Sequence, residues 1–500
     1  MYKIRKTKTA SGATAVQVVS YQAGRTNILK HIGSAHTADE LSALYDHARS
    51  YIEQRAGQTS LFPIPSKQRT FSLAHTRLLR TTHLFARSFF HACARVCGLN
   101  SLDPVVIDLA FMRIIEPSSK LRALELIDRF FTVRYSKRAY GVLRSLLAEK
   151  TVIERAALTC ARTALKEELF LILYDVTTLY FETFRADALR IHGFSKDDKS
   201  KQPQIVVGLI TTRSGFPLGH DVFPGKTFEG NTMLPILETF SRNHSVKTPI
   251  VVADAAMLSQ KNMEELKRRN MQYIVGGRIA NTSPSFIRKV SKALGRRDGR
   301  IVRFSSGRHG DLICSFSRKR YRKDKREMER QIARAHRLIE KNEAGQRAKF
   351  VKNVGGGVAL NKDLINKTKA ILGIKTYCTN IPRKILSNKK VIACYHDLWN
   401  VEHSFRMSKH DLQARPVFHR TEDAIRAHLL LCFVSLMMGR FLEITTGLSL
   451  RKVRDFVWNV EEAHIEDTVT KETFVLRTPL DELLKSPLGP LVARWKCDTY

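Results

Sequence analysis

The hydrophobic pattern of the chain changes near residue 169. Between about residues 70 and 167, apolar positions recur at helical spacing and predict a run of helices. Pro117 divides FMRIIEPSSKLRALELIDRFF into two of these helices, and Ser118 or Ser119 is placed to cap the second. From Leu169 onward, nearly continuous apolar runs predict buried strands instead. They cover Leu169–Phe181, Gln204–Thr211 and Pro217–Phe223.

The order of the elements after Leu169 indicates the class of fold. The turn at residues 213–215 joins the second and third strands as an antiparallel hairpin. Strands and helices then alternate through NTMLPILETFSR, PIVVADAAM, SQKNMEELKRRN and YIVGGRI. Three strands followed by strand–helix alternation suit an α/β, ribonuclease-H-like core.

The changes of pattern predict six segments. Residues 1–60 form a small β-hairpin plus a helix with Thr37 as its cap, and two prolines mark a linker at 58–67. Residues 61–168 form a helical, candidate DNA-binding region. The core occupies 169–280 and resumes at 373–450, 281–372 is an insertion domain, and 451–500 is a C-terminal tail.

The longest apolar run, Leu429–Met438, predicts a buried helix. It has about ten residues, whereas a membrane span needs roughly 20. The polar N-terminus predicts no signal peptide, and eight scattered cysteines without a CxxC pair fit a reducing cytoplasm.

Charge points to a polyanionic partner. The chain has 84 Lys and Arg against 47 Asp and Glu, a net charge of +37, which favours nucleic acid. Residues 318–337 read as a long charged helix that contacts DNA or a second subunit, or is merely solvated. Basic residues also follow the polar faces of the helical region: Arg113, Lys120, Arg122, Arg134, Lys137 and Arg138.

Two of the predicted strands each contain a single acid in apolar surroundings. Asp175 lies inside the first strand, and Asp254 ends the apolar run PIVVADAAM. Because ligands of α/β sheets gather at strand ends, we expect the two carboxylates to converge there. Their repulsion then calls for a cation, and oxygen ligands without His or Cys favour Mg²⁺ or Mn²⁺.

A third carboxylate is expected from the helix that begins near Val391. One face of it carries Tyr395, Leu398, Trp399, Glu402, Arg406 and Lys409. This mixture suits a face that holds a metal through Glu402 and DNA through its neighbours. Alternatives stay open: Asp175 can accept from Thr177 or Thr178, Asp254 can cap a turn, and Glu402 can pair with Arg406.

Several segments together resemble bacterial insertion-sequence transposases of the DDE class, in the group with a Tyr-Arg-Glu-Lys signature. Tyr395, Glu402 and Lys409 match three signature positions, Leu398 occupies the arginine position, and Arg406 is the candidate substitute. Lys226, Ala256 and Leu372 also depart from the group's usual residues. The segments are DVTTLYFE, GFSKDDKSKQPQIVVGLI, GFPLGHDVFPGKTFEGNT, VVADAAMLSQKN, YIVGGRI and YHDLWNVEHSFRMSKHDLQARPVFH.

The resemblance implies a ribonuclease-H-like fold with a β-rich insertion before the glutamate helix. It implies Asp175, Asp254 and Glu402 as catalytic, metal-binding residues. We expect them to hold two Mg²⁺ ions, which Mn²⁺ can replace, with Asp175 bridging both. The resulting enzyme would cut DNA at inverted-repeat ends and join them to target DNA, as a homodimer on DNA in the bacterial cytoplasm, at the nucleoid. Tyr395, Trp399, Arg406 and Lys409 are the expected DNA contacts.

Two other functions remain open from the sequence. The departures at Leu398, Lys226 and Leu372 motivate a catalytically silent DNA-binding protein of transposase descent. A ribonuclease-H-like nuclease that cuts without strand transfer is the second alternative.

Overall fold

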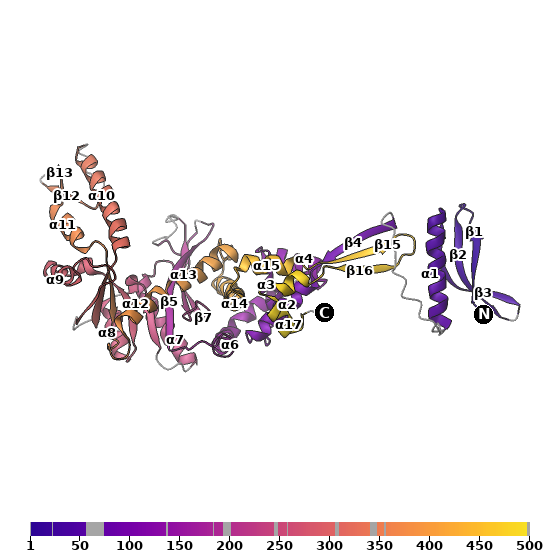
Figure 1. Cartoon of the computed structure of the whole chain (residues 1–500), viewed down its shortest axis with the longest axis horizontal. Coiled ribbons are helices and arrows are strands. Elements are labelled where there is room, and N and C mark those ends of the chain that lie inside the picture. The colour runs from indigo at the N-terminus through magenta and orange to yellow at the C-terminus, as the bar shows by residue number, and fades with distance from the viewer. Residues whose placement is uncertain are drawn as a thin grey trace. The chain divides into compact units, whose positions relative to one another are not determined.

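The computed structural model describes residues 2–22, 24–56, 75–136, 139–183, 185–193, 202–244, 249–257, 259–305, 310–340, 348–354 and 357–497. Two compact units divide the chain (Figure 1). The first combines residues 1–89, 125–134 and 455–500, and the second combines 90–124 and 135–454. The predicted linker at 58–67, Lys137 and Arg138 lie outside the described residues.

The N-terminal segment of the first unit is a three-stranded sheet with a helix on one face, where a hairpin was predicted. Strands β1 (Tyr2–Lys8), β2 (Thr14–Gln22) and β3 (Arg25–Ala35) pair antiparallel in that order, and α1 (Ala38–Ala56) follows. β3 gives a weak sequence signal because only Ile32 and Ala35 of it are buried. Thr37 caps α1 as predicted: its Oγ1 accepts from the Glu40 amide, and Glu40 Oε2 accepts from the Thr37 amide, both at 3.2 Å.

A second sheet of the first unit lies in a stretch that was predicted to be helical. Strand β4 (Thr76–Thr82) pairs with β15 (Glu462–Asp467), which also pairs with β16 (Thr473–Arg477). The partner strand of β4 lies about 380 residues further along the chain, so the local sequence pattern does not predict this pairing. The short helices α16 (Asp481–Lys485) and α17 (Gly489–Trp495) end the described part.

The second unit is built on an eight-stranded mixed sheet of order β10-β11-β14-β9-β8-β5-β6-β7. The hairpin strands β5, β6 and β7 are antiparallel, whereas β5, β8 and β9 run parallel. The predicted strands therefore form, in the predicted order. Their bounds are β5 (Leu171–Tyr180), β6 (Gln204–Thr211), β7 (Pro217–Pro224), β8 (Ile250–Ala253), β9 (Tyr273–Gly277) and β14 (Ile374–Thr379).

Helices cover both faces of this sheet. Asp175, Leu209 and His220 are cross-strand neighbours on one face, where His220 stacks on Phe433 of α14. On the opposite face Gly219 lies against Phe240 of α7. The face that carries Asp175 is therefore covered by α13 and α14. The bounds are α7 (Met233–His244), α8 (Gln260–Arg268), α12 (Asn388–His396), α13 (Trp399–Arg406) and α14 (Glu422–Thr446).

The segment predicted to be an insertion is partly continuous with the large sheet. Strand β11 (Asp311–Phe316) pairs with β14, and β10 (Ile301–Ser305) pairs with β11 at the sheet edge. The rest of the segment packs around α10 (Arg318–Glu340). It comprises α9 (Pro284–Leu294), β12 (Val351–Val354), β13 (Gly357–Leu360) and α11 (Lys362–Ile371).

The remaining helices include the most apolar one. α14 is long and apolar enough to cross a membrane by length and composition, but 89% of its apolar window is buried inside the protein, as predicted for a buried helix. Ser119 Oγ accepts from the Arg122 amide at 3.2 Å and caps α4. The other bounds are α2 (Leu84–Val96), α3 (Pro104–Ile115), α4 (Lys120–Phe131), α5 (Ala139–Ser145), α6 (Lys150–Thr163) and α15 (Leu450–Trp458).

Two cations that were assigned to a DNA-facing surface of the helical region are buried instead. Arg113 is 7% exposed and donates to the carbonyls of Leu412 and Gln413 at 2.9 and 3.1 Å. Lys120, also 7% exposed, contacts ring nitrogens of His419 at 2.6 Å and His428 at 3.0 Å. Helical periodicity did not separate these cations from exposed ones, because their acceptors lie about 300 residues away.

Candidate active site

The main chain brings the two aspartates together. β5 and β8 are adjacent parallel strands, and their last paired rung joins Tyr174 to Ala253. Asp175 is the next residue of β5, and Asp254 directly follows the end of β8. Paired residues of neighbouring strands project from the same face, and strands are about 4.8 Å apart. The predicted convergence of these two acids therefore follows from the strand register.

The environments of the two aspartates differ. Asp175 is half-buried, whereas Asp254 is exposed. Asp254 Oδ1 accepts from the amide of Ala255 at 2.6 Å and from Tyr395 Oη at 3.1 Å. Burial, and then the negative charge of Asp254, raise the pKa of Tyr395, so that the phenol is a stable donor to this carboxylate.

The predicted helix from Val391 is a series of three short helical pieces. Ser387 caps α12, which ends at His396, and α13 starts at Trp399 and passes into a π-helical turn at Met407–Asp411. Asp397 and Leu398 between the pieces keep right-handed helical backbone angles. The i, i+3, i+4 spacing of the predicted face is therefore preserved, and α13 packs against β5.

A cleft of about 1050 Å³ gathers all of the predicted site residues. Asp175, Asp254 and Glu402 line it. The six residues of the predicted helical face line the same cleft: Tyr395, Leu398, Trp399, Glu402, Arg406 and Lys409. The structure thus brings together the three predicted metal ligands and the four DNA contacts that were expected beside them, Tyr395, Trp399, Arg406 and Lys409.

The side chains that line the cleft differ in solvent exposure, which distinguishes those that a ligand can contact from those that pack in the core. Trp399 is 58% exposed, and Glu402 and Arg406 are exposed too, whereas Leu398 and Tyr395 are each 8% exposed. The described residues show no ion pair between Glu402 and Arg406, so the simple helix-pair alternative does not hold. The hydroxyl of Thr178 is buried and has no hydrogen-bond partner, so it does not donate to Asp175.

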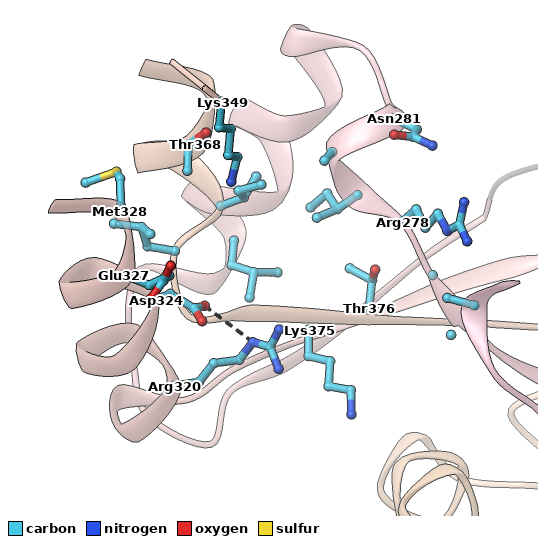
Figure 2. Close-up of a pocket in the computed structure, with 18 of the residues that line it drawn as sticks. Arg278, Asn281, Arg320, Asp324, Glu327, Met328, Lys349, Thr368, Lys375 and Thr376 are labelled. Atoms are coloured by element: carbon cyan, nitrogen blue, oxygen red, sulfur yellow. Dashed lines mark ion pairs between the residues drawn. The ribbon is translucent and has the colours of Figure 1, made fainter. Parts of the chain in front are cut away.

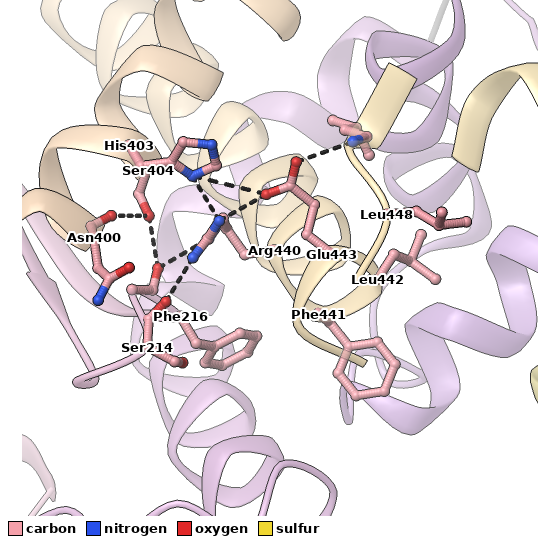
Figure 3. A network of polar contacts seen from close by, with 12 residues as sticks. Ser214, Phe216, Asn400, His403, Ser404, Arg440, Phe441, Leu442, Glu443 and Leu448 are labelled. Atoms are coloured by element: carbon pink, nitrogen blue, oxygen red, sulfur yellow. Dashed lines mark hydrogen bonds and ion pairs between the residues drawn. The ribbon is translucent and has the colours of Figure 1, made fainter. Parts of the chain in front are cut away.

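A buried network fixes α13 beside the sheet (Figure 3). Arg440 of α14 donates to the Ser214 carbonyl at 2.5 Å, to Glu443 Oε2 at 2.6 Å and contacts His403 Nδ1 at 2.7 Å. Ser404 Oγ donates to the Gly215 carbonyl at 2.6 Å. Ser404 and Arg440 therefore connect the β6–β7 turn with α13. These hydrogen bonds fix the position of the backbone from which the Glu402 side chain extends.

Sequence reasoning missed one cation of the cleft. Lys375 of β14 is half-buried, lines the cleft, and its Nζ lies 4.7 Å from the ring centroid of Tyr395. Burial chiefly lowers the pKa of Lys375, and Arg320 adds to this, while Asp254 and Glu402 oppose it. A signal was available, since Lys375 is a lone charge in an apolar strand, as Asp175 is.

The donor set of the cleft fits a hard divalent cation. Three carboxylates and no thiolate or imidazole among the candidate ligands suit Mg²⁺ or Mn²⁺. Across the described residues, no three Asp, Glu, His or Cys side chains are yet close enough together to hold an ion. The ligand roles of the three acids stay predictions.

Comparisons with known proteins bear on this cleft. A family model described as a transposase DDE domain matches residues 171–438, more than half of the chain and the whole segment from β5 to α14 that builds the cleft. None of the curated proteins compared with the chain matches it. A cryo-EM structure of piggyBac transposase in a synaptic complex with hairpin DNA is similar at 9% identity and a TM-score of 0.39. The match covers 75% of this chain and 79% of that one. A likeness this distant carries no argument about the site.

Proposed function

The chain belongs to the transposase DDE domain family, and from this premise we propose that it cuts DNA at the ends of a mobile element and joins those ends to target DNA. The observation that carries the proposal is the strand register. It puts Asp175 and Asp254 on one face of the sheet, in a cleft that Glu402 and several cations also line. The strand order of β5 to β9 supports a ribonuclease-H-like core.

Asp175, Asp254 and Glu402 would hold two Mg²⁺ ions. Bound there, the ions would neutralise the phosphate and activate the attacking water or 3′-hydroxyl. Tyr395 and the Ala255 amide orient the Asp254 carboxylate through their hydrogen bonds. Arg440 and Ser404 hold the helix from which Glu402 extends.

The other cleft residues bind the DNA. Arg406 and Lys409 lie one and two turns beyond Glu402 and would contact backbone phosphates, and Lys375 beside Tyr395 adds positive charge to the cleft. Trp399 offers an exposed ring on which a base can stack. Because phosphoryl transfer needs positioning and charge neutralisation above all, these residues suffice without a catalytic histidine. Two element ends need two such clefts, which favours a homodimer on DNA.

The test is a cleavage assay on a plasmid that carries the DNA flanking this reading frame. With Mg²⁺ or Mn²⁺ the wild-type chain should nick at the element ends and join them to a second DNA, and EDTA should abolish both reactions.

The alternative is a DNA-binding protein that no longer cuts. It is favoured by the buried Leu398 at the arginine position of the signature. Specific binding to the element ends without nicking in Mn²⁺ would establish this alternative. Nicking without joining would point to a nuclease.

A further inference from the structure

Helix α10 has two faces of opposite character. One face is apolar: Met328, Ala335 and Leu338 are buried against Phe350 and Ile365. The other face is basic and lines an open hollow of about 640 Å³ together with Asp298. We call this face the basic stripe; it comprises Arg318, Lys319, Arg322, Lys323, Arg326 and Arg330.

Five of the six cations of the stripe are not neutralised by the protein. Two acids of α10 pair outside the stripe, Asp324 with Arg320 and Glu329 with Lys325, and Glu327 pairs with the sixth member, Arg330. Asp298 accepts from the backbone amide of Arg318. Within the described part of the chain, five members of the stripe form no ion pair, and all are exposed: Arg318, Lys319, Arg322, Lys323 and Arg326.

This arrangement opposes the stability of the helix. Arg318, Arg322, Arg326 and Arg330 follow one another at intervals of four residues, as do Lys319 and Lys323. Like charges at that spacing destabilise a helix by about 0.2–0.5 kcal/mol per pair. The apolar face on the core therefore holds a helix whose exposed charges repel one another, and a polyanion would remove that repulsion.

The stripe starts close to the catalytic cleft. Arg320, in the first turn of α10, lines a cavity of about 490 Å³ with Arg278 and Lys349. Lys375 and Tyr395 line both this cavity and the cleft. Figure 2 shows Arg320 of α10 beside Lys375 of β14. Asp324, which pairs with Arg320, and Glu327 line this cavity too, so charged side chains of both signs connect the cleft with the first turns of α10.

We propose that the basic stripe of α10 is a docking surface for the backbone of double-stranded DNA that extends beyond the catalytic cleft. The occupant follows from charge complementarity: from Arg318 to Arg330 the stripe extends about 18 Å along the helix, a length over which a duplex presents roughly ten phosphates. Contacts of this kind read no sequence. The inference rests on the proposed function, which says which DNA would lie on the stripe. Its test does not depend on cleavage, because it measures binding to a duplex of arbitrary sequence.

The test compares two double variants of the full chain. Arg322→Ala/Arg326→Ala removes two charges from the stripe. The control Arg451→Ala/Lys452→Ala removes two exposed charges from α15, outside the stripe, and neither residue forms an ion pair in the described part of the chain. Binding of each to a duplex of arbitrary sequence is measured by fluorescence anisotropy against salt concentration, without divalent cations. The thermal midpoint of each variant is recorded, and the stripe variant should not melt below wild type because it loses like-charge repulsion.

The stripe variant should lower the slope of log affinity against log salt by about 1.8, since each lost phosphate contact is worth about 0.9. The control should keep the wild-type slope. Equal slopes for wild type, stripe variant and control would overturn the inference, and a changed self-association of the stripe variant with an unchanged slope would assign the surface to a second copy. If the stripe variant keeps the wild-type slope and the wild-type chain still cleaves DNA, the inference about the stripe is wrong and the proposed function is unaffected.

Discussion

The charges around the cleft and the charges beneath it are arranged in opposite ways. Glu402 and Arg406 are exposed on neighbouring turns of one helical face and do not pair with each other. Arg440 and Arg113, by contrast, are buried and donate to several backbone carbonyls. An isolated charge is costly to bury, so the buried cations are saturated by the protein. The cleft charges are exposed, like Glu402 and Arg406, or half-buried, like Asp175, so a ligand can reach them. The difference teaches which charges serve the fold and which are available for binding.

The largest effect should come from removing a cleft charge. Asp175→Ala should lower cleavage by about three orders of magnitude or more, since the lost charge neutralisation is worth several kcal/mol in the transition state. Duplex binding and the midpoint of urea unfolding should stay near wild type. Glu264→Gln, an exposed acid on α8 outside the cleft, is the matched control. Cleavage by Asp175→Ala at the wild-type rate would show that the cleft charges do not serve catalysis.

The second effect should be on stability and should come from a buried charge. Arg440→Met removes the arginine donor from Glu443 Oε2 and from the carbonyl of Ser214 and leaves the partly buried carboxylate without its cation, so we expect the free energy of unfolding to fall by about 3–5 kcal/mol. Urea denaturation measures this loss. Arg451→Met removes an exposed arginine on α15 and should change stability by less than about 0.5 kcal/mol. Equal losses in the two variants would show that burial does not separate the two classes.

A smaller effect should come from the aromatic side of the cleft. Trp399→Ala should weaken the binding of DNA with an unpaired end by about 1–3 kcal/mol and leave stability nearly unchanged, because the ring is exposed. Titrations with frayed and with fully paired duplexes check this. A variant that loses stability but not affinity would reassign Trp399 to packing.

The smallest effect should be a pH dependence of the buried group around Lys120. Burial chiefly, and then Lys120 and Arg113, lower the pKa of His419 to about 4. The unfolded chain protonates this histidine near pH 6.5, whereas the folded chain resists until about pH 4. The native state therefore loses stability as pH falls through that interval. Between pH 6.5 and 4 the thermal midpoint of His419→Gln should fall by less than that of wild type. Parallel curves of thermal midpoint against pH for the two proteins would refute the assignment.

The sequence was informative where the signal is local. The apolar strands β5 to β9, the buried α14 and the face that carries Glu402 all follow from periodicity within one segment. β4 was missed because its partner strand lies at the other end of the chain. The buried Arg113 and Lys120 were misassigned for the same reason. Helical periodicity shows on which face of a helix a cation lies, but not which distant segment packs against that face. Lys375 could have been found by the rule that identified Asp175.

The shared rung of β5 and β8 makes the gap between the first two acids a property of main-chain geometry. Buried side chains on either strand can be exchanged for others of similar volume while that gap stays constant. A single inserted or deleted residue that slipped one strand against the other would instead turn its acid to the far side of the sheet. Among descendants of this chain, residues 171–174 and 250–253, which are all buried, should therefore exchange one apolar side chain for another of similar volume but show almost no change in length.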